Sequence, residues 1–303
     1  MTGFFISIGC IIIDDIILPD GSSRMGTLGG GATHAVMGMR IWSERVGLVS
    51  PVGADFGSDQ LAALAGLFDL HGLVVRPNDP TPRAWQLFET DGTRNEVFRT
   101  SYAGMAAMEP KPEDLPAFYN PLEGVHLHCA PQDVPQWAPA LRRRGARVIL
   151  WEPWDPFCAP ENREAFCQNS RLVDIVSPNL KEGRHLTGLA DPADVVHALQ
   201  EYGAPVGVLR MGEAGSLIAG PGGELISIPA CLVEKIVDVT GAGNAFCGGF
   251  IVGLARTGDL RQAGWYGGVS ASMALGQFGA VYPLTGVREE AQRRLEWYGE
   301  HGG

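Results

Sequence analysis

Residues 236–250 read IVDVTGAGNAFCGGF and combine backbone freedom with a clear helix start. Gly241, Ala242 and Gly243 lead into small and apolar side chains that recur at helical spacing, which predicts a glycine turn opening a helix. Free backbone N–H groups and the positive end of the helix dipole meet at such a start, so it can bind an anion without a basic side chain. The residues alone leave open an ordinary loop that leads into a buried, glycine-rich helix.

Upstream of this stretch, apolar runs alternate with polar, helix-like segments. The runs are residues 124–129, 147–152, 172–177 and 206–211. This βαβα rhythm predicts a mainly parallel sheet with helices on both faces. Residues 4–18 form a nearly continuous β-branched run, which predicts one more strand, buried on both faces. No repeat or linker interrupts the pattern, so we expect residues 1–303 to form a single α/β domain.

Composition limits the classes of partner. With 19% charged residues, a formal charge of −11 and a pI near 5.1, the chain lacks the clustered Lys and Arg that nucleic acid requires, apart from Arg142–Arg144. The apolar run near the N-terminus follows no basic segment and is interrupted by Asp14 and Asp15, so we expect neither a signal peptide nor a membrane anchor. Six scattered cysteines without a CxxC pair favour reduced thiols over a zinc site or disulfides. A cytoplasmic location is the resulting expectation.

Two segments near the N-terminus carry candidate ligand contacts. Asp14 and Asp15 end the first predicted strand, where open α/β sheets place ligand contacts, although both acids can also simply cap the strand. Residues 28–36 read LGGGATHAV, and Gly30 and Gly31 let the backbone approach a ligand closely before a helix that we expect to run to about Arg45.

Two further segments have a predicted structure without an assigned role. Residues 84–88 and 96–99 alternate in polarity around Asp91-Gly92, which predicts a β-hairpin. Residues 151–156 read WEPWDP, and their two prolines and two tryptophans favour a rigid packed loop over a surface that faces substrate.

Six motifs resemble, in order, those of the ribokinase-like (PfkB) family of sugar and nucleoside kinases, and most resemble its fungal "maintenance of killer" branch. They lie at residues 9–15, 29–36, 52–57, 178–188, 206–215 and 238–249. The resemblance implies a three-layer α/β sandwich with a mainly parallel central sheet. It also implies a small β lid, which we place at about residues 16–27 and 84–108, and through which a homodimer contact is expected.

The resemblance assigns roles residue by residue. It implies a catalytic anion hole at Gly241, Ala242 and Gly243, followed by Asn244 where the family has an Asp that accepts the substrate proton. The implied substrate contacts are Asp14, Gly30, Gly31, His34 and Asp238, with Asp15 a solvent or structural partner and His34 standing where the family usually has Asn. The implied contacts to ATP are Asn179, Arg210, Gly212, Gly215 and Thr240, and Glu182 is the implied Mg²⁺ site.

Two of these assignments have structural alternatives. Asn179 and Glu182, three residues apart at a helix start, share one face suited to water-ligated Mg²⁺, but the same pair forms a capping box. The Arg210 guanidinium can pair with a phosphate or make a surface ion pair.

The resemblance implies an ATP-dependent and Mg²⁺-dependent phosphotransferase acting on a hydroxyl of a small sugar, nucleoside or related molecule. An amide such as that of Asn244 does not accept a proton at neutral pH, and a positioned base contributes about 10² to 10⁴ in rate, so we expect slow or atypical turnover. The alternatives are a degenerate protein that binds nucleotide or small molecules for regulation, and a different reaction on the same scaffold.

Overall fold

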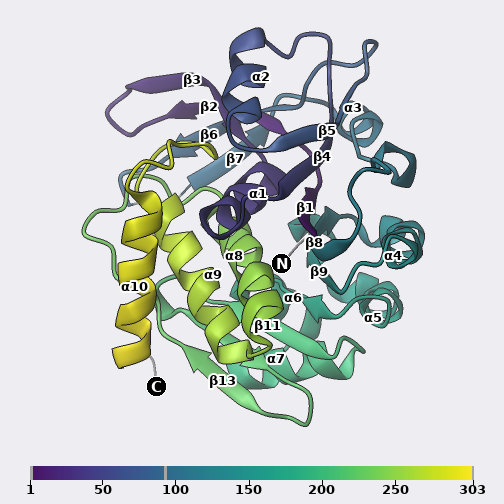
Figure 1. Cartoon of the computed structure of the whole chain (residues 1–303), viewed down its shortest axis with the longest axis vertical. Helices are drawn as coiled ribbons and strands as arrows, with labels where there is room; N and C mark the ends of the chain where they lie inside the picture. Colours follow the sequence, from purple (N-terminus) through teal and green to yellow (C-terminus); the bar gives the residue numbers. More distant parts are fainter. Residues whose placement is uncertain (1–2, 92–93, 302–303) are drawn as a thin grey trace.

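The computed structural model describes residues 3–91 and 94–301, and within them a nine-stranded sheet forms the middle of the molecule (Figure 1). Its order is β13-β12-β11-β10-β9-β8-β1-β4-β5; neighbouring strands from β5 to β11 are parallel, and β12 and β13 are antiparallel. The strands are β1 (Phe4–Ile8), β4 (Val46–Val52), β5 (Asp69–Val75), β8 (Leu122–Cys129), β9 (Val148–Pro153), β10 (Ile175–Val176), β11 (Val206–Arg210), β12 (Ser216–Ala219) and β13 (Leu225–Ile228). The mainly parallel sheet is confirmed.

Helices cover both faces of this sheet (Figure 1). One face carries α1 (Gly31–Trp42), α8 (Ala242–Thr257) and α9 (Leu260–Ala274), with α10 (Val287–His301) against α9, and the other carries α4 (Val134–Arg143), α5 (Arg163–Ser170), α6 (Leu180–Thr187) and α7 (Pro192–Glu201). The short helices α2 (Ser58–Ala65) and α3 (Tyr102–Ala107) precede and follow strands near the β5 edge.

Alternation along the strands divides the core into two layers. On β8, Val125 and Leu127 pack in the cluster that contains α4, α5 and α7, whereas on β9 and β11 Leu150 and Val208 pack in the cluster around α8 and α9. Successive strand residues point to opposite faces, so the intervening residues of β8 point toward α8. The three-layer sandwich is therefore confirmed.

A second sheet forms the lid, with order β3-β2-β6-β7. It consists of β2 (Ile12–Ile17), β3 (Ser23–Gly29), β6 (Arg83–Phe88) and β7 (Arg94–Phe98), and it lies at one end of the molecule, beside α1 (Figure 1). The predicted hairpin is present as β6 and β7, and its turn residue Gly92 lies outside the described residues. The lid is drawn from residues 12–29 and 83–98, so it begins earlier than expected and does not extend to residue 108.

The expectation of one strand over residues 4–18 is wrong. The chain leaves the central sheet after Ile8, and from Ile12 it runs in the lid. Between them, the backbone N–H of Ile11 donates to Ser50 Oγ at 2.9 Å, outside either strand ladder. Hydrophobicity did not reveal the break because both segments are buried. Asp14 consequently belongs to the lid and not to the end of a central strand.

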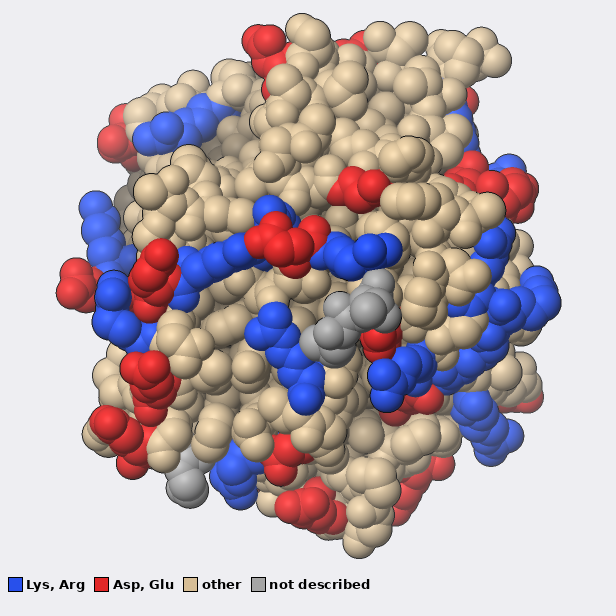
Figure 2. Space-filling model, viewed as in Figure 1, with Lys and Arg blue, Asp and Glu red and all other residues tan. Residues whose placement is uncertain are grey.

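The surface shows no dominant patch of one charge on the face in Figure 2, where basic and acidic side chains are interspersed. None of the helices formed by residues 3–91 and 94–301 has the length and apolar character needed to cross a bilayer.

Helices α1 and α8 cross at a distance that only glycine permits. A Cβ on Gly248 would lie 2.0 Å from the carbonyl oxygen of Ala35, and one on Gly38 would lie 2.3 Å from that of Ala245. These contacts are with backbone, which cannot move aside as a side-chain end can. The pair of helices therefore brings its two N-termini together.

We predict that Gly248→Ala lowers the free energy of unfolding by about 3 kcal/mol, because the added methyl group forces α1 and α8 apart. The matched control is Gly299→Ala on α10, where nothing lies within 4 Å of the added Cβ. There the same change should raise stability by about 0.5 kcal/mol through lower unfolded-state entropy. Urea denaturation of both variants measures this, and equal stabilities would contradict the close crossing.

Candidate active site

The start of α8 is built around Gly241. This N-cap residue has φ +73°, and a Cβ on it would lie 2.0 Å from Cγ of His34, so both its conformation and its surroundings require glycine. No side chain caps α8. The N–H of Ala242 donates to the carbonyl oxygen of Val239 at 3.4 Å, and those of Gly243 and Asn244 present the positive end of a 16-residue helix to an anion.

Arg210 lies against this helix start. A Cβ on Gly243 would be 2.1 Å from Nη1 of Arg210. The other guanidinium nitrogen, Nη2, lies 2.7 Å from Oε1 of Glu152 and 3.8 Å from Oε2 of Glu182. These carboxylates are buried, so the alternative of a surface ion pair is wrong. The contact of Arg210 with a phosphate stays a prediction, and the position beside the α8 N-terminus is compatible with it.

Glu152, on β9, makes buried contacts with side chains of α8 and β8. Its Oε2 accepts a hydrogen bond from Nδ2 of Asn244 at 2.9 Å and lies 2.7 Å from Nε2 of His126, whose Nδ1 is 2.8 Å from Ser7 Oγ. The hydrogen bond with Glu152 therefore orients the Asn244 side chain, with Nδ2 toward the central sheet. Its Oδ1 makes no hydrogen bond with a described residue and is available to a ligand.

The charge of Glu152 is compensated by its neighbours. Burial alone would raise the pKa of this carboxyl group, but the Arg210 charge and the hydrogen bond with His126 hold that pKa well below its usual range. Glu152 is therefore ionised across the physiological pH range.

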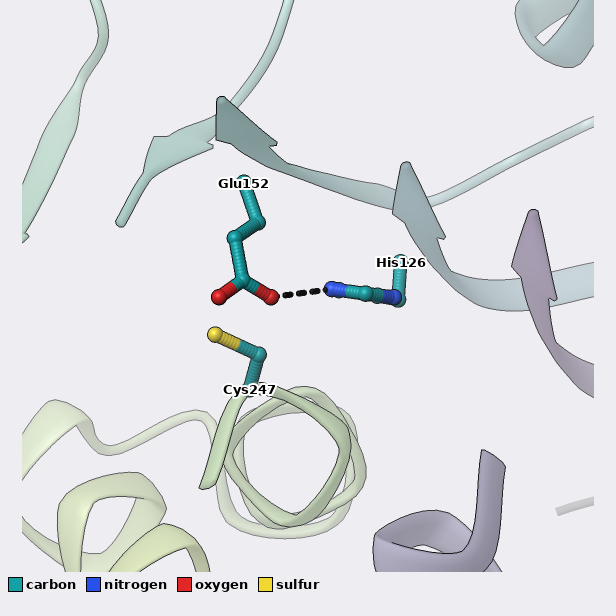
Figure 3. Close-up of side chains that lie close together, drawn as sticks. All are labelled: His126, Glu152 and Cys247. Carbon is teal, nitrogen blue, oxygen red and sulfur yellow. Dashed lines mark hydrogen bonds and ion pairs between the residues drawn. The ribbon is translucent and has the colours of Figure 1, made fainter. Parts of the chain in front are cut away.

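His126, Glu152 and Cys247 lie close together, with potential ligand atoms within 4.8 Å of one another (Figure 3). A metal does not fit this group. The Arg210 guanidinium already neutralises Glu152, and burial, followed by the charge of Glu152, raises the pKa of the Cys247 thiol well above its usual value, so that it stays protonated. The cluster is a buried polar network.

Asp14 approaches from the lid. It is 3% exposed, its Oδ1 accepts from Nε2 of Gln86 at 2.9 Å, and a Cβ on Gly29 would lie 1.8 Å from its Oδ2. Burial raises the pKa of Asp14 to about 7. Asp15, by contrast, pairs with Arg99 at 2.7 Å, which confirms it as a structural residue.

The glycine turn before α1 lies between the lid and α8. Gly30 has φ +90°, and a Cβ on Gly31 would lie 2.6 Å from Nδ1 of His128 and 2.9 Å from Nδ2 of Asn244. His34, one turn into α1, packs its ring on Gly241; burial lowers its pKa to about 4, and its Nε2 has no hydrogen-bond partner among the described residues. An unpaired buried nitrogen favours a ligand or water at this point.

The loop before α8 contains the last two implied contacts. Asp238 is 2% exposed, and its Oδ1 accepts from the backbone N–H of Thr240 at 2.7 Å. The hydroxyl of Thr240 is buried and finds no partner within the described chain. Their roles toward substrate and nucleotide stay predictions.

The pair at the start of α6 forms the capping box that the sequence offered as an alternative. Oε1 and Oε2 of Glu182 accept from Nδ2 and N of Asn179 at 2.6 and 2.7 Å, and Asn179 Oδ1 accepts from the N–H of Glu182 at 2.9 Å. Burial raises the pKa of Glu182 to about 7, against the charge of Arg210. The Mg²⁺ role of Glu182 stays a prediction, best suited to an ion held through water.

Gly212 and Gly215 lie beyond Arg210 in the turn between β11 and β12. Both have positive φ, and a Cβ on Gly215 would lie 2.0 Å from the carbonyl oxygen of Ile228. Gly215 is thus required by the turn itself. The contact of Gly212 and Gly215 with nucleotide stays a prediction.

The structure adds three residues that sequence reasoning missed: His126, His128 and Glu152. His126 and His128 alternate on β8 and point toward α8, and the register of the sheet places His128 beside Glu152. The sequence signal was present, because two histidines spaced by two residues in a strand share one face. Glu152 ends the predicted run 147–152 and also lies in the segment 151–156, for which a packed loop was favoured; in the structure it is part of β9.

Comparisons with known proteins show which proteins the chain is similar to. The model of the pfkB family carbohydrate kinases matches residues 7–285. The chain is 30% identical to the cytidine kinase of Thermococcus kodakarensis, over 84% of this chain and 90% of that protein, and 26% identical to MAK32 of Saccharomyces cerevisiae, over 89% and 84%. An E. coli protein assigned as a ribokinase II, solved with ATP and Mg²⁺, superposes with a TM-score of 0.78 at 20% identity, covering 96% of this chain and 99% of that one.

We predict that Asn244→Asp is destabilising because it places a second carboxylate in contact with Glu152, so that one of the two must bind a proton. The new Asp should have a raised pKa in the folded state. The substitution therefore leaves the free energy of unfolding unchanged below about pH 4. As the pH rises above that, it lowers the free energy of unfolding increasingly, by about 3 kcal/mol at pH 7.

Urea denaturation at pH 5 and pH 7 measures this cost. The control is Glu152→Gln combined with Asn244→Asp, which keeps one carboxylate and one amide in the cluster and should recover most of the loss. Equal stability of Asn244→Asp and wild type at pH 7 would show that Glu152 does not hold the Asn244 side chain.

Proposed function

The chain belongs to the pfkB family of carbohydrate kinases, and from this premise we propose that it is an ATP-dependent phosphotransferase acting on a hydroxyl of a small sugar, nucleoside or related molecule. The observation that carries the proposal is the start of α8, where an uncapped helix N-terminus and the Arg210 guanidinium meet beside the Gly30-Gly31 turn. That combination suits a phosphate on one side and a hydroxyl-bearing molecule on the other.

The nucleotide side of the site supports ATP. Phosphate oxygens would find the first-turn N–H groups of α8 and the guanidinium of Arg210, while Thr240 offers a buried hydroxyl that lacks a partner. Glu182 would hold Mg²⁺ through water, since its oxygens already accept from Asn179. When bound, the ion supplies charge neutralisation between phosphates. The E. coli structure with ATP and Mg²⁺ supports this assignment at the level of the family.

The substrate side supports a molecule with several hydroxyl groups. Asp14, whose Oδ1 accepts from Gln86, presents its other carboxylate oxygen from the lid, and the orphaned Nε2 of His34 offers a second polar atom from α1. Ionised carboxylates accept hydrogen bonds from hydroxyls, and amides and neutral imidazoles both donate and accept. The name of the Thermococcus relative, cytidine kinase, makes nucleosides the first substrates to test.

Phosphoryl transfer depends mainly on positioning and on stabilising charge around the moving group, and both are available at the α8 start. Asn244 occupies the position at which the family motif carries a proton-accepting Asp. Its amide favours a second candidate function, binding of nucleotide and small molecule without turnover. Both candidate functions, phosphotransferase and binding protein, use the same anion site. They differ in whether bound ATP is consumed.

The lid offers a surface for a second copy of the chain. Trp85, Val97 and Phe98 on β6 and β7 are 39%, 42% and 49% exposed, and β3 and β7 are the outer strands of the lid sheet. We propose a homodimer through this surface, in a cytoplasmic protein. Analytical ultracentrifugation should show a dimer for wild type and a monomer for Val97→Lys, and a monomeric wild type would overturn it.

We predict that the wild type consumes ATP in the presence of Mg²⁺ and at least one member of a panel of nucleosides and sugars, with product identified by mass spectrometry. Binding of ATP is measured in parallel by calorimetry. Binding without consumption on the whole panel would favour the binding protein, and absence of nucleotide binding would overturn both candidates.

The pH dependence of kcat/KM tests the role of Asp14. Because its pKa is raised to about 7, Asp14 is protonated at pH 6 and ionised at pH 8, and only the ionised form accepts two substrate hydroxyls. We therefore expect kcat/KM to rise about tenfold from pH 6 to pH 8. Asp14→Asn should lower kcat/KM and remove this rise, and a rise that persists in the variant would exclude Asp14 as its cause.

A further inference from the structure

The lid face that carries Asp14 also carries two charged side chains without an assigned role, Glu96 and Arg94 of β7. On the ladder between β6 and β7, Gln86 lies opposite Glu96, and Arg94 is two residues from Glu96. Paired residues share a face of a sheet, and so do residues two apart in a strand. Asp14 pairs with Ala84, two residues before Gln86. Asp14 therefore points to the same side of the lid as Glu96 and Arg94.

This side of the lid faces the candidate site. The opposite face carries Trp85 and Val97, which are 39% and 42% exposed, whereas Gln86 is 1% exposed. The charge of Arg94 also acts on a group of the site on α1. Burial lowers the pKa of His34 to about 4, and the charge of Arg94 acts in the same direction.

The amide of Gln86 holds the charged side chains in place. Its Nε2 donates to Oδ1 of Asp14 at 2.9 Å and to Oε1 of Glu96 at 2.8 Å, and its Oε1 accepts from Nη1 of Arg94. Both N–H groups and the oxygen of the amide are thereby used, which fixes its orientation. Because one nitrogen bonds both carboxylates, Glu96 lies next to Asp14, and a single small molecule can reach both.

Glu96 and Arg94 each keep a polar edge that no described residue fills. Oε2 of Glu96 makes no hydrogen bond within residues 3–91 and 94–301, and neither do Nε and Nη2 of Arg94. The two side chains are 33% and 29% exposed, so these edges are open to a ligand. Nε and Nη2 form the two-pronged side of a guanidinium, which binds two adjacent acceptors at once.

The charges of this group favour a neutral ligand. The carboxylates of Asp14 and Glu96 outnumber the guanidinium of Arg94, whose Nη1 lies 4.0 Å from Oε1 of Glu96. A carboxylate or phosphate on the substrate would add a further negative charge at the same place and is disfavoured. The group instead offers two adjacent donors on Arg94 beside an acceptor on Glu96.

The edge of a nucleobase supplies the complement of this pattern. Cytosine presents O2 and N3 as adjacent acceptors and its N4 amino group as the next donor, and guanine presents N7 and O6 followed by N1–H. In uracil a donor separates the two acceptors, and in adenine the amino group does, so the two-pronged side of a guanidinium cannot engage two acceptors of either base. A sugar hydroxyl both donates and accepts and sets no such order.

We propose that the substrate is a nucleoside whose base edge is bound by Arg94 and Glu96, and that cytidine and guanosine fit this pair. The inference rests on the proposed phosphotransferase function, in which Asp14 holds hydroxyls of the sugar. The base is attached to that sugar and lies beside Asp14 on the lid. Its adjacent acceptors bind Nε and Nη2 of Arg94, its donor binds Oε2 of Glu96, and Gln86 is a positioning residue for both.

The test compares kcat/KM for cytidine, uridine, guanosine, adenosine and D-ribose at saturating ATP and Mg²⁺. Wild type should prefer cytidine to uridine, and guanosine to adenosine, by about 10- to 100-fold. Arg94→Gln should bring the ratio of cytidine to uridine within about threefold of one, with kcat/KM for D-ribose changed less than about threefold. Arg94→Lys keeps the charge but has no two-pronged side, so it should lose the ratio as well.

The matched control is Arg83→Gln on the opposite face of the same lid. Arg83 lies 3.5 Å from Asp15, which keeps its closer partner Arg99 at 2.7 Å. This variant should keep the wild-type ratio of cytidine to uridine. Loss of the ratio in Arg83→Gln as well would overturn the assignment to Arg94.

The outcomes separate the base contact from the phosphotransferase function. A wild type that uses uridine as well as cytidine, or D-ribose as well as any nucleoside, overturns the base contact and leaves the function intact, and so does an Arg94→Gln variant that keeps the ratio. Should Arg94→Gln lose its folded circular dichroism spectrum, Arg94→Lys decides.

A wild type that consumes no ATP with any of the five compounds overturns the phosphotransferase function. Calorimetric Kd values for cytidine and uridine then test the base contact by itself. Equal values overturn it, and a tenfold or greater preference for cytidine that Arg94→Lys removes supports it.

Discussion

The buried carboxylate of Glu152 is the interaction on which the site depends. A charge in the interior costs several kcal/mol unless it is paired and hydrogen-bonded, and Glu152 satisfies this requirement with Arg210, His126 and Asn244. These partners come from β11, β8 and α8, so a single charge connects three elements. The ion pair with Glu152 holds Arg210 beside the N-terminus of α8. The positive guanidinium and the positive end of the helix dipole repel each other, and the negative charge of Glu152 offsets this repulsion.

A second constraint, steric in origin, brings the substrate side to the same place. Helices α1 and α8 cross through Gly38 and Gly248, each of which faces a backbone carbonyl of the other helix at a distance no side chain tolerates. The N-termini of the two helices consequently meet, with the Gly30-Gly31 turn on one and Asn244 on the other. The lid adds Asp14 above this junction. The groups that we propose to bind phosphate and substrate hydroxyls thus lie around one rigid support.

The amide of Asn244 matches the buried charge of Glu152. With Glu152 ionised on one side, an amide is the residue that can donate to it and still present an acceptor to a ligand, whereas a second carboxylate would be repelled.

The sequence by itself determined the sandwich, the glycine start of α8 and the lid hairpin, because each depends on local spacing or on an apolar period. It offered the capping box of Asn179 and Glu182 only as an alternative, which the structure shows to be formed. Only the tertiary structure decided that the run over residues 4–18 divides between two sheets, since burial makes both halves apolar. It alone placed Arg210 on Glu152, and His128 beside Gly31 and Asn244. These contacts join residues 58 to 116 positions apart, whose pairing is set by strand order and helix crossing, and no local pattern encodes them.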